Sequence, residues 1–316
     1  MARLSDLRVE PISPDDEILH PRTAGPGTSS PTTALDHVSR RAAAVARRWI
    51  PEALKAPLRR LRGLPIGTWE REATRLRALE PFTRGVSRLL GPEIEFVDPC
   101  SFLFTAEELF LRQLYRFVSP TDSPVVLDCG ANIGLSILYV KALYPKARIT
   151  AFEPDPVAFG VLQGNVERFG LVDVELRQEA VWRSNGVARF RQQGGDAGRL
   201  AMAGEVSAAI DVRTTRIRDF LEEPVDFLKI DIEGAESEVI EDCAGSLGRV
   251  QRMFVEYHSL VNRLQRVDVI FRVLREAGLR THVEAFAPSP HPFVSRSIRT
   301  GMDSLDMALN IWAFRP

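Results

Sequence analysis

A short turn with two glycines decides the fold class of this 316-residue chain: residues 128–134 read DCGANIG. The apolar run VVL at 125–127 comes directly before the turn, and the apolar segment 135–144 directly follows it. The first run is interpreted as the end of a buried strand, and the second as a helix. Glycines at such a junction let a ligand approach the backbone, next to the unpaired N–H groups of the helix start. The stretch therefore predicts a ligand-binding strand–turn–helix unit.

The alternation of strand and helix continues towards the C-terminus. Short apolar or β-branched runs recur at residues 148–152, 172–176, 227–230, 253–255 and 308–314. Because helical segments separate the first four of these, they predict a mostly parallel sheet with helices on both faces. One departure is 180–190, where Asn185-Gly186 between two alternating runs predicts a type I′ hairpin inserted after the third strand. The expected fold class is α/β, in one domain over residues 119–316.

The N-terminal third of the chain has a different composition. Residues 1–34 mix acidic side chains with Pro, Gly, Ser and Thr, which predicts a flexible tail. The segment 35–63 carries eight basic and two acidic side chains with apolar residues interleaved, which predicts helix broken at prolines. Such a segment either packs on its own domain or docks on an anionic membrane surface or acidic partner. Residues 66–118 are expected to be helical apart from an extended break at 93–97, so 35–118 is interpreted as a basic, mostly helical extension or cap.

The composition disfavours several classes of protein. With 41 basic and 42 acidic side chains, the chain lacks the positive field of a protein that wraps nucleic acid. Cys100, Cys129 and Cys243 form no CxxC pair or Cys/His cluster, so neither a disulfide framework nor a zinc site is expected. No signal-peptide-like segment and no apolar run of roughly 18 residues is present, which predicts a cytoplasmic protein without an integral membrane segment. The oligomeric state stays open.

The turn differs from the phosphate-binding turn of dinucleotide enzymes. Gly130 and Gly134 lie four positions apart, with Asn132 between them, where those enzymes have GxGxxG. Asp128 precedes the turn, and its carboxylate would repel a pyrophosphate but can pair with the ammonium of a bound amino-acid moiety. Glu153, at the end of the second strand, lies where such folds hydrogen-bond ribose hydroxyls. These residues favour S-adenosyl-L-methionine as the ligand, and the alternative is an NAD(P)-dependent oxidoreductase.

A second polar block follows the strand at 227–230, where residues 229–236 read KIDIEGAE. Because the carboxyl ends of parallel strands meet at one edge, Asp231 and Glu233 are expected to lie near the glycine turn. Lys229 lies inside an apolar run, and burying its ammonium without a carboxylate partner would be costly. Glu236 is interpreted as a first-turn charge favoured by the helix dipole.

Four motifs, in this order along about residues 100–290, resemble the FkbM-type S-adenosylmethionine-dependent methyltransferases. They are the DCGANIG turn, the strand end FEPDP at 152–156, the segment EAV at 179–181 and the KIDIEGAE block. The resemblance implies a Rossmann-like methyltransferase fold with an antiparallel C-terminal strand. It also implies transfer of the cofactor's methyl group to a hydroxyl of a sugar, glycolipid or natural product. The residues that it assigns to the cofactor are Asp128, Gly130, Asn132 and Gly134 at the methionine end, Glu153 at the ribose, and Glu179 and Ala180 at the adenine.

Methyl transfer to a hydroxyl needs an aligned acceptor oxygen and a group that takes the hydroxyl proton. The candidates are Asp231, Glu233 and His258, the last of which follows a strand predicted at 253–257. Asp231 ranks first, because the family's acid block places it nearest the methyl group. Asp231, Glu233 and Glu256 would suit Mg²⁺, but they match no recognised ligand spacing, and no metal is predicted.

Two further features leave alternatives open. Residues 286–293 read FAPSPHPF and are expected to form either a loop over the site or a proline-stiffened connection to the last strand. The alternative to an enzyme is a methyltransferase-like scaffold that holds a membrane surface or a partner through residues 35–63.

Overall fold

The computed structural model describes residues 66–90, 92–192, 198–200, 209–285, 298–300 and 303–316. The predicted tail, the basic segment 35–63 and the loop 286–293 therefore lie outside the described residues. Within the described part of the chain, no helix combines the length and apolar character that crossing a membrane requires.

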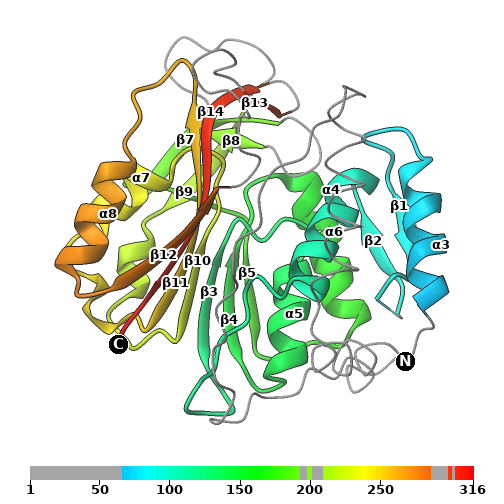
Figure 1. Ribbon diagram of the computed structural model, residues 1–316, viewed down its shortest axis with the longest axis horizontal. Coiled ribbons are helices and arrows are strands. Elements are labelled where there is room, and N and C mark those ends of the chain that lie inside the picture. Colours follow the sequence, from blue (N-terminus) through cyan, green and yellow to red (C-terminus); the bar gives the residue numbers. More distant parts are fainter. Residues whose placement is uncertain (1–65, 91, 193–197, 201–208, 286–297, 301–302) are drawn as a thin grey trace, which may run out of the picture.

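A central sheet organises the C-terminal two thirds of the molecule (Figure 1). Its strands lie in the order β12-β14-β11-β10-β3-β4-β5. The parallel part consists of β5 (Val174–Arg177), β4 (Arg148–Phe152), β3 (Val125–Cys129), β10 (Phe227–Ile230) and β11 (Arg252–Leu260). The long β14 (Asp303–Phe314) inserts antiparallel between β11 and β12 (Arg280–Ala285), and β13 (Ile298–Thr300) pairs with it. The mostly parallel Rossmann-like sheet with an antiparallel C-terminal strand is thus confirmed, whereas β12 was not predicted.

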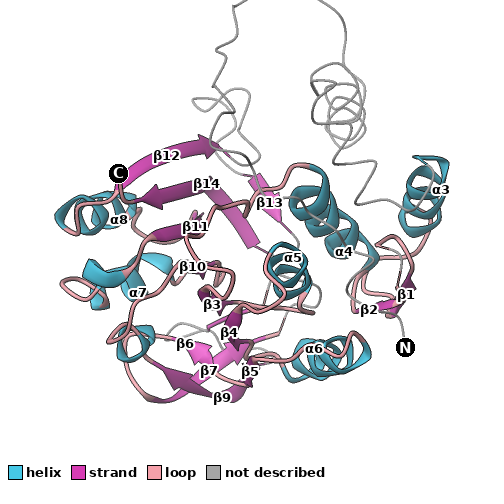
Figure 2. Ribbon diagram, turned by 90° about the horizontal axis from the view of Figure 1, so that it is seen from below, coloured by secondary structure: helices cyan, strands magenta, loops and turns pink. Residues whose placement is uncertain are grey.

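Helices cover both faces of this sheet. Figure 2 shows α5 (Leu135–Leu143) and α6 (Pro156–Arg168) on one face, and α7 (Glu236–Asp242) and α8 (Val267–Glu276) on the other. Each face has its own apolar core, as the alternation along a strand requires. In β3, Val126 belongs to the core under α5 and α6, whereas Leu127 belongs to the core under α7 and α8.

The same alternation places charged residues on the α5 side of the sheet. Asp128 lies two positions after Val126, and Lys229 is its register partner on β10. Both side chains are buried. The period of the strand therefore brings two charges of opposite sign together next to the glycine turn.

The N-terminal extension is less helical than predicted. It consists of α3 (Ile66–Arg77), β1 (Gly85–Ser87), β2 (Ile94–Phe96), α4 (Pro99–Ala106) and a π-helical turn, Glu107–Leu111. The expected break at 93–97 is β2, but it pairs antiparallel with β1, which was predicted as helix. The amide of Asn165 on α6 accepts from the Glu95 N–H and donates to the Glu95 carbonyl, both at 3.0 Å, and so holds this hairpin on the domain.

The predicted Asn-Gly hairpin is wrong. Strands β6 (Ala180–Val181), β9 (Ala209–Thr215), β7 (Gly186–Arg191) and β8 (Arg199–Leu200) form a second sheet in the order β6-β9-β7-β8. Because β6 and β7 lie on opposite sides of β9, they do not pair with each other. Asn185 accepts from the Arg216 N–H at 2.8 Å and donates to Asp219 at 3.1 Å. Its side chain therefore fixes the loop against the chain that follows β9 and closes no turn.

The remaining differences concern shorter segments. The third strand begins at Val174, two residues later than expected, and Asp173 before it takes a left-handed φ of 55°. Two 3-10 turns, Ile217–Phe220 and Leu247–Arg249, connect the later strands.

Candidate active site

A pocket lies at the carboxyl ends of β3, β4, β10 and β11, with α4 and the π-helical turn as its outer wall. This is the crevice that an open parallel sheet leaves where strand order reverses, here between β3 and β10. Seven of its lining residues carry carboxylates and one, Lys229, carries an ammonium. The pocket is thus strongly acidic in the part of the chain that the structure describes.

The turn after β3 has a left-handed backbone at three positions. Gly130, Asn132 and Gly134 have φ angles of 84°, 47° and 91°. A Cβ at position 130 would lie 1.9 Å from the Asp231 carbonyl oxygen, so glycine is required where the ends of β3 and β10 approach each other. The Asn132 side chain ends in a buried Oδ1 that accepts no hydrogen bond from any described residue. The turn therefore presents an unused acceptor at the pocket.

Glu153 reaches from the end of β4 to the same turn. Its Oε2 accepts from the Asn132 N–H and its Oε1 from the Asp155 N–H, each at 2.8 Å. Burial raises the pKa of Glu153 to about 7, although the two N–H donors act in the opposite direction. A carboxyl group with this pKa gains or loses its proton near neutral pH, so its charge can respond to what binds beside it.

Lys229 has the carboxylate partners that the sequence required. Its Nζ lies 3.1 Å from Asp231 Oδ2 and 3.7 Å from Asp128 Oδ1, and it donates to the Gly130 carbonyl at 2.5 Å. Burial opposes the ammonium charge, but the two carboxylates outweigh it and raise the pKa of Lys229. Asp128 also accepts a short hydrogen bond from Ser136. The lysine thus joins the ends of β3 and β10 beneath the turn.

The KIDIEGAE block forms a strained loop between β10 and α7. Glu233 takes a left-handed φ of 57°, which is rare for a residue with a side chain. Glu236 stabilises the loop, because its Oε1 accepts from the Gly234 N–H at 2.9 Å and the Ile232 N–H at 3.3 Å. The sequence interpretation of Glu236 as an ordinary first-turn charge missed this buried role.

His258 lies inside β11, so its predicted place just after a strand is wrong. The strand continues to Leu260 because β14 pairs with its whole length. The His258 Nδ1 lies 3.3 Å from Glu236 Oε1, and its Nε2 lies 3.5 Å from Glu256 Oε1 and 3.7 Å from Glu233 Oε2. Burial disfavours the imidazolium, but these carboxylates outweigh it and raise the pKa of His258 well above its ordinary value.

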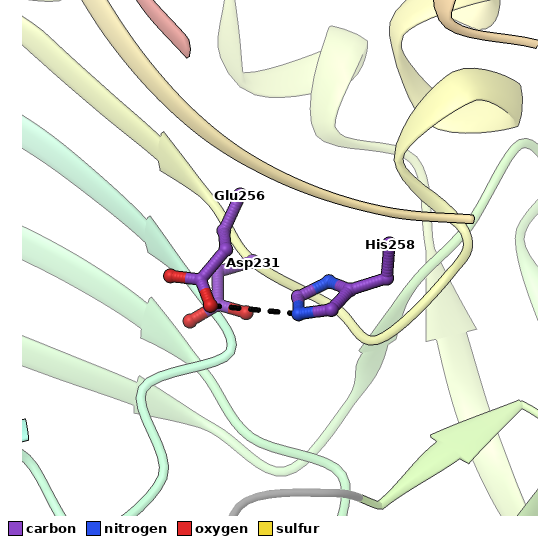
Figure 3. Close-up of side chains that lie close together, drawn as sticks. All are labelled: Asp231, Glu256 and His258. Atoms are coloured by element: carbon purple, nitrogen blue, oxygen red, sulfur yellow. Dashed lines mark ion pairs between the residues drawn. The ribbon is translucent and has the colours of Figure 1, made fainter. Parts of the chain in front are cut away.

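Three groups that can ligate a metal meet at this point (Figure 3). Asp231, Glu256 and His258 each offer one ligand atom, and these atoms lie within 4.8 Å of one another. The set of possible Mg²⁺ ligands considered from the sequence was Asp231, Glu233 and Glu256. In the structure His258, and not Glu233, joins Asp231 and Glu256.

The pocket brings together half of the residues predicted for the site: Gly130, Asn132, Glu153, Asp231 and Glu233. Asp128, Gly134 and His258 do not line it, and Asp128 is buried against Lys229. Glu179 and Ala180 also lie outside the lining, at the start of the second sheet. Glu179 pairs with Arg177 at 3.0 Å.

The outer wall of the pocket was missed by sequence reasoning. Phe102 and Thr105 on α4, and Glu108 and Leu109 on the π-helical turn, line it, together with Tyr115. The Tyr115 ring packs 4.7 Å from the Phe254 ring of β11, which anchors this wall to the sheet. The sequence predicted helix over most of residues 66–118, but it held no information on the surface against which this segment packs.

Comparison with known proteins identifies the family. The methyltransferase FkbM domain matches residues 128–293. Methyltransferase sdnD of Sordaria araneosa is 30% identical over 220 residues, which cover 58% of this chain and 78% of sdnD. The 2-O-methyltransferase NoeI of Sinorhizobium fredii is 29% identical over 168 residues, covering 46% of this chain and 68% of NoeI. The 31-O-demethyl-FK506 methyltransferase FkbM of Streptomyces tacrolimicus is 27% identical over 222 residues, which cover 58% of this chain and 84% of that enzyme. The chain belongs to the FkbM methyltransferase family.

Proposed function

We propose that this protein is an S-adenosylmethionine-dependent O-methyltransferase that acts on a hydroxyl of a sugar, glycolipid or natural product. The observation that carries the proposal is the pocket at the glycine turn, lined by seven carboxylates and one ammonium. Such a pocket attracts a sulfonium and an ammonium and repels a pyrophosphate. Together with the family assignment, this argues against the NAD(P)-dependent alternative.

The residues of the turn fit the cofactor. The unused Asn132 Oδ1 is an acceptor suited to the cofactor's ammonium, and Glu153 is suited to accept hydrogen bonds from ribose hydroxyls. Asp128 and Gly134 would support the turn without lining the pocket. Asp128 would do so through its pairing with Lys229, and Gly134 through its left-handed backbone. Glu179 and Ala180 remain the proposed border of the adenine.

When bound, S-adenosylmethionine would supply an electrophilic methyl group, which would pass to the acceptor hydroxyl oxygen while the sulfur leaves as a thioether. The chain must then accept the hydroxyl proton. We assign this role to Asp231, which lines the pocket and which Lys229 orients at 3.1 Å. Glu233 and His258 are the other candidates. Since His258 does not line the pocket, it would act through Glu233, whose Oε2 lies 3.7 Å from its Nε2.

The relatives support transfer to oxygen. NoeI is named a 2-O-methyltransferase, and the Streptomyces tacrolimicus enzyme is named for 31-O-demethyl-FK506. Because these two names point to different acceptors, the acceptor is proposed only as a hydroxyl compound. Within the chain, residues 119–316 would form the catalytic domain, and α4 with the π-helical turn would form the wall against which the acceptor lies.

Calorimetry with S-adenosylhomocysteine tests the cofactor half of the proposal. We expect one site per chain with micromolar affinity, weakened by Glu153→Gln and unchanged by Asp122→Asn at an exposed surface position. NADH should produce no fluorescence quenching. Incubation with methyl-labelled cofactor and a metabolite extract, followed by mass spectrometry, tests the transfer. A wild-type protein that fails to bind S-adenosylhomocysteine would refute the assignment.

A further inference from the structure

Asp231, Glu256 and His258 lie close enough together that they could hold a metal ion (Figure 3). One ligand atom from each lies within 4.8 Å of the others. Around an octahedral ion with bonds of about 2.1 Å, neighbouring ligand atoms lie about 3 Å apart and opposite ones about 4.2 Å apart. The Nε2 of His258 and Oε1 of Glu256, 3.5 Å apart, fall within this range. The two carboxylates suit a hard divalent ion such as Mg²⁺ or Mn²⁺, and the imidazole favours a transition metal such as Mn²⁺.

The histidine is held in the orientation that a metal ligand needs. Its Nδ1 faces the fully buried Glu236 at 3.3 Å, so an imidazole that binds an ion through Nε2 would keep its proton on Nδ1. Protein metal sites commonly use such a carboxylate behind the histidine to fix its tautomer and orientation. Glu236 also accepts from loop N–H groups, which makes it a rigid support.

A second, independent observation lies on the neighbouring strand. Asn310 on β14 is the register partner of Glu256, so both side chains project from the same face of the sheet at adjacent positions. Asn310 is 2% exposed, and its Oδ1 accepts no hydrogen bond from any described residue. A buried amide oxygen without a donor is costly, and an amide oxygen is a ligand for hard divalent cations. Asn310 therefore offers an amide oxygen without a donor on the face of the sheet that carries Glu256.

The cluster holds two carboxylates close together. Glu256 is largely buried, and its carboxylate lies within the same cluster as that of Asp231. A divalent cation between the carboxylates would remove their mutual repulsion.

We propose that Asp231, Glu256 and His258, with the Asn310 amide oxygen beside them, bind one divalent cation of the Mg²⁺ or Mn²⁺ class. Asp231 and Glu256 line the pocket, so the ion would be reached from the acceptor side. Its role rests on the proposed function: a hydroxyl bound to the ion would be more acidic, and its proton would pass to the Asp231 carboxylate oxygen that does not bind the ion. This replaces the sequence expectation that no metal is bound.

Mn²⁺ binding to the full-length chain, stripped with EDTA and dialysed, tests the site without cofactor or acceptor. Electron paramagnetic resonance and calorimetry should give one Mn²⁺ per chain with micromolar affinity. Glu256→Gln and His258→Asn should each weaken binding at least tenfold, and Asn310→Ala should weaken it severalfold. Asp122→Asn, at a side chain that is 71% exposed, should bind Mn²⁺ like the wild type. Circular dichroism and the melting temperature check that each variant folds. A single folded variant of the cluster is enough to test whether these residues bind Mn²⁺.

The outcomes separate the ion from the cofactor. The stripped wild type is also titrated with S-adenosylhomocysteine. Binding of S-adenosylhomocysteine without saturable Mn²⁺ binding would overturn the ion site alone. Saturable Mn²⁺ binding without binding of S-adenosylhomocysteine would overturn the proposed function alone. Mn²⁺ binding that all folded cluster variants retain would place the ion elsewhere and also overturn the site.

Discussion

The Lys229 ammonium lies 3.1 Å from the Asp231 carboxylate and 3.7 Å from that of Asp128, so one buried cation pairs with carboxylates at the ends of two strands. Lys229 and Asp128 are register partners on β10 and β3, which makes the contact a direct product of strand pairing. The lysine also donates to the Gly130 carbonyl. This set of contacts couples the glycine turn, which we assign to the cofactor, to the acid that we assign to the acceptor.

Lys229→Met should therefore destabilise the protein strongly. Removing one partner of a buried ion pair leaves uncompensated charge and costs about 3–5 kcal/mol. Urea denaturation measures the loss of the free energy of unfolding. Lys146→Met is the matched control, because the Lys146–Asp122 pair is exposed and its loss should not be measurable. Equal stability of Lys229→Met and the wild type would contradict the buried-pair account.

Gly130→Ala should disrupt the turn and with it the binding of S-adenosylhomocysteine. The left-handed backbone alone costs about 1–3 kcal/mol for a residue with a Cβ, and the new atom would meet the Asp231 carbonyl. Gly164→Ala within α6 is the control, since nothing lies within 4 Å of its Cβ, and it should stabilise the helix by about 0.5–1 kcal/mol. Thermal unfolding and calorimetry on both variants distinguish them. Normal ligand binding by Gly130→Ala would show that the turn is not needed.

Binding of S-adenosylhomocysteine should release a proton near pH 6.5. The pKa of Glu153 is raised to about 7, by burial first and also by Asp155, while the Asn132 and Asp155 N–H groups and Lys229 lower it. Ribose hydroxyls donate to the ionised carboxylate, so affinity should rise with pH up to about 7 and level off above it. Calorimetry in buffers of different ionisation enthalpy measures the released proton.

In the ligand-free protein, ionisation of Glu153 should lower stability as pH rises, whereas it should raise the affinity for the ligand. Its folded pKa lies above the ordinary value of 4.5, so its contribution to stability is complete below pH 4.5 and is lost as pH rises through 7. The free energy of unfolding of the ligand-free chain should thus fall across this interval, and Glu153→Gln should reduce that slope. A proton release that Glu153→Gln retains would assign the titration to another group.

The sequence predicted the parts of the fold that depend on local pattern. The apolar runs around Val126 and Leu228 were recognised because strands buried on both faces need continuous apolar side chains. The glycine turn between strand and helix and the need of Lys229 for a carboxylate followed from the chemistry of single residues. Both kinds of inference use information that lies within a few positions along the chain.

The parts that depend on distant partners were not predictable in this way. Asn185-Gly186 has the local signature of a hairpin, but β9 separates the two strands that it joins. His258 was placed beyond its strand, because the pairing with β14 that extends β11 comes from residues some fifty positions later. Glu236 was interpreted as a first-turn charge favoured by the helix dipole, whereas in the structure its buried carboxylate accepts from N–H groups of the loop before it. In each case tertiary contacts, absent from the local pattern, decided the outcome.

Glu236 provides the last prediction, because it supports the site without lining the pocket. Glu236→Gln keeps the shape of the side chain but removes the charge that faces His258 Nδ1 at 3.3 Å and replaces an acceptor of the loop N–H groups. We expect a melting temperature lower by several degrees and methyl transfer reduced at least tenfold in kcat. Affinity for S-adenosylhomocysteine should stay close to that of the wild type, since Asn132 and Glu153 are untouched. Steady-state kinetics and calorimetry separate these effects.

The matched control for Glu236 is Glu238→Gln, two positions further along α7. Glu238 pairs with Arg266 at 3.3 Å on the partly exposed side of the helix, where loss of the charge should change stability by less than about 1 kcal/mol and leave kcat intact. A purely structural role for Glu236 would lower the melting temperature but leave kcat and its pH profile unchanged in the fraction that remains folded. A positioning role requires that both change, because the orientation and the charge state of His258 depend on the carboxylate behind it.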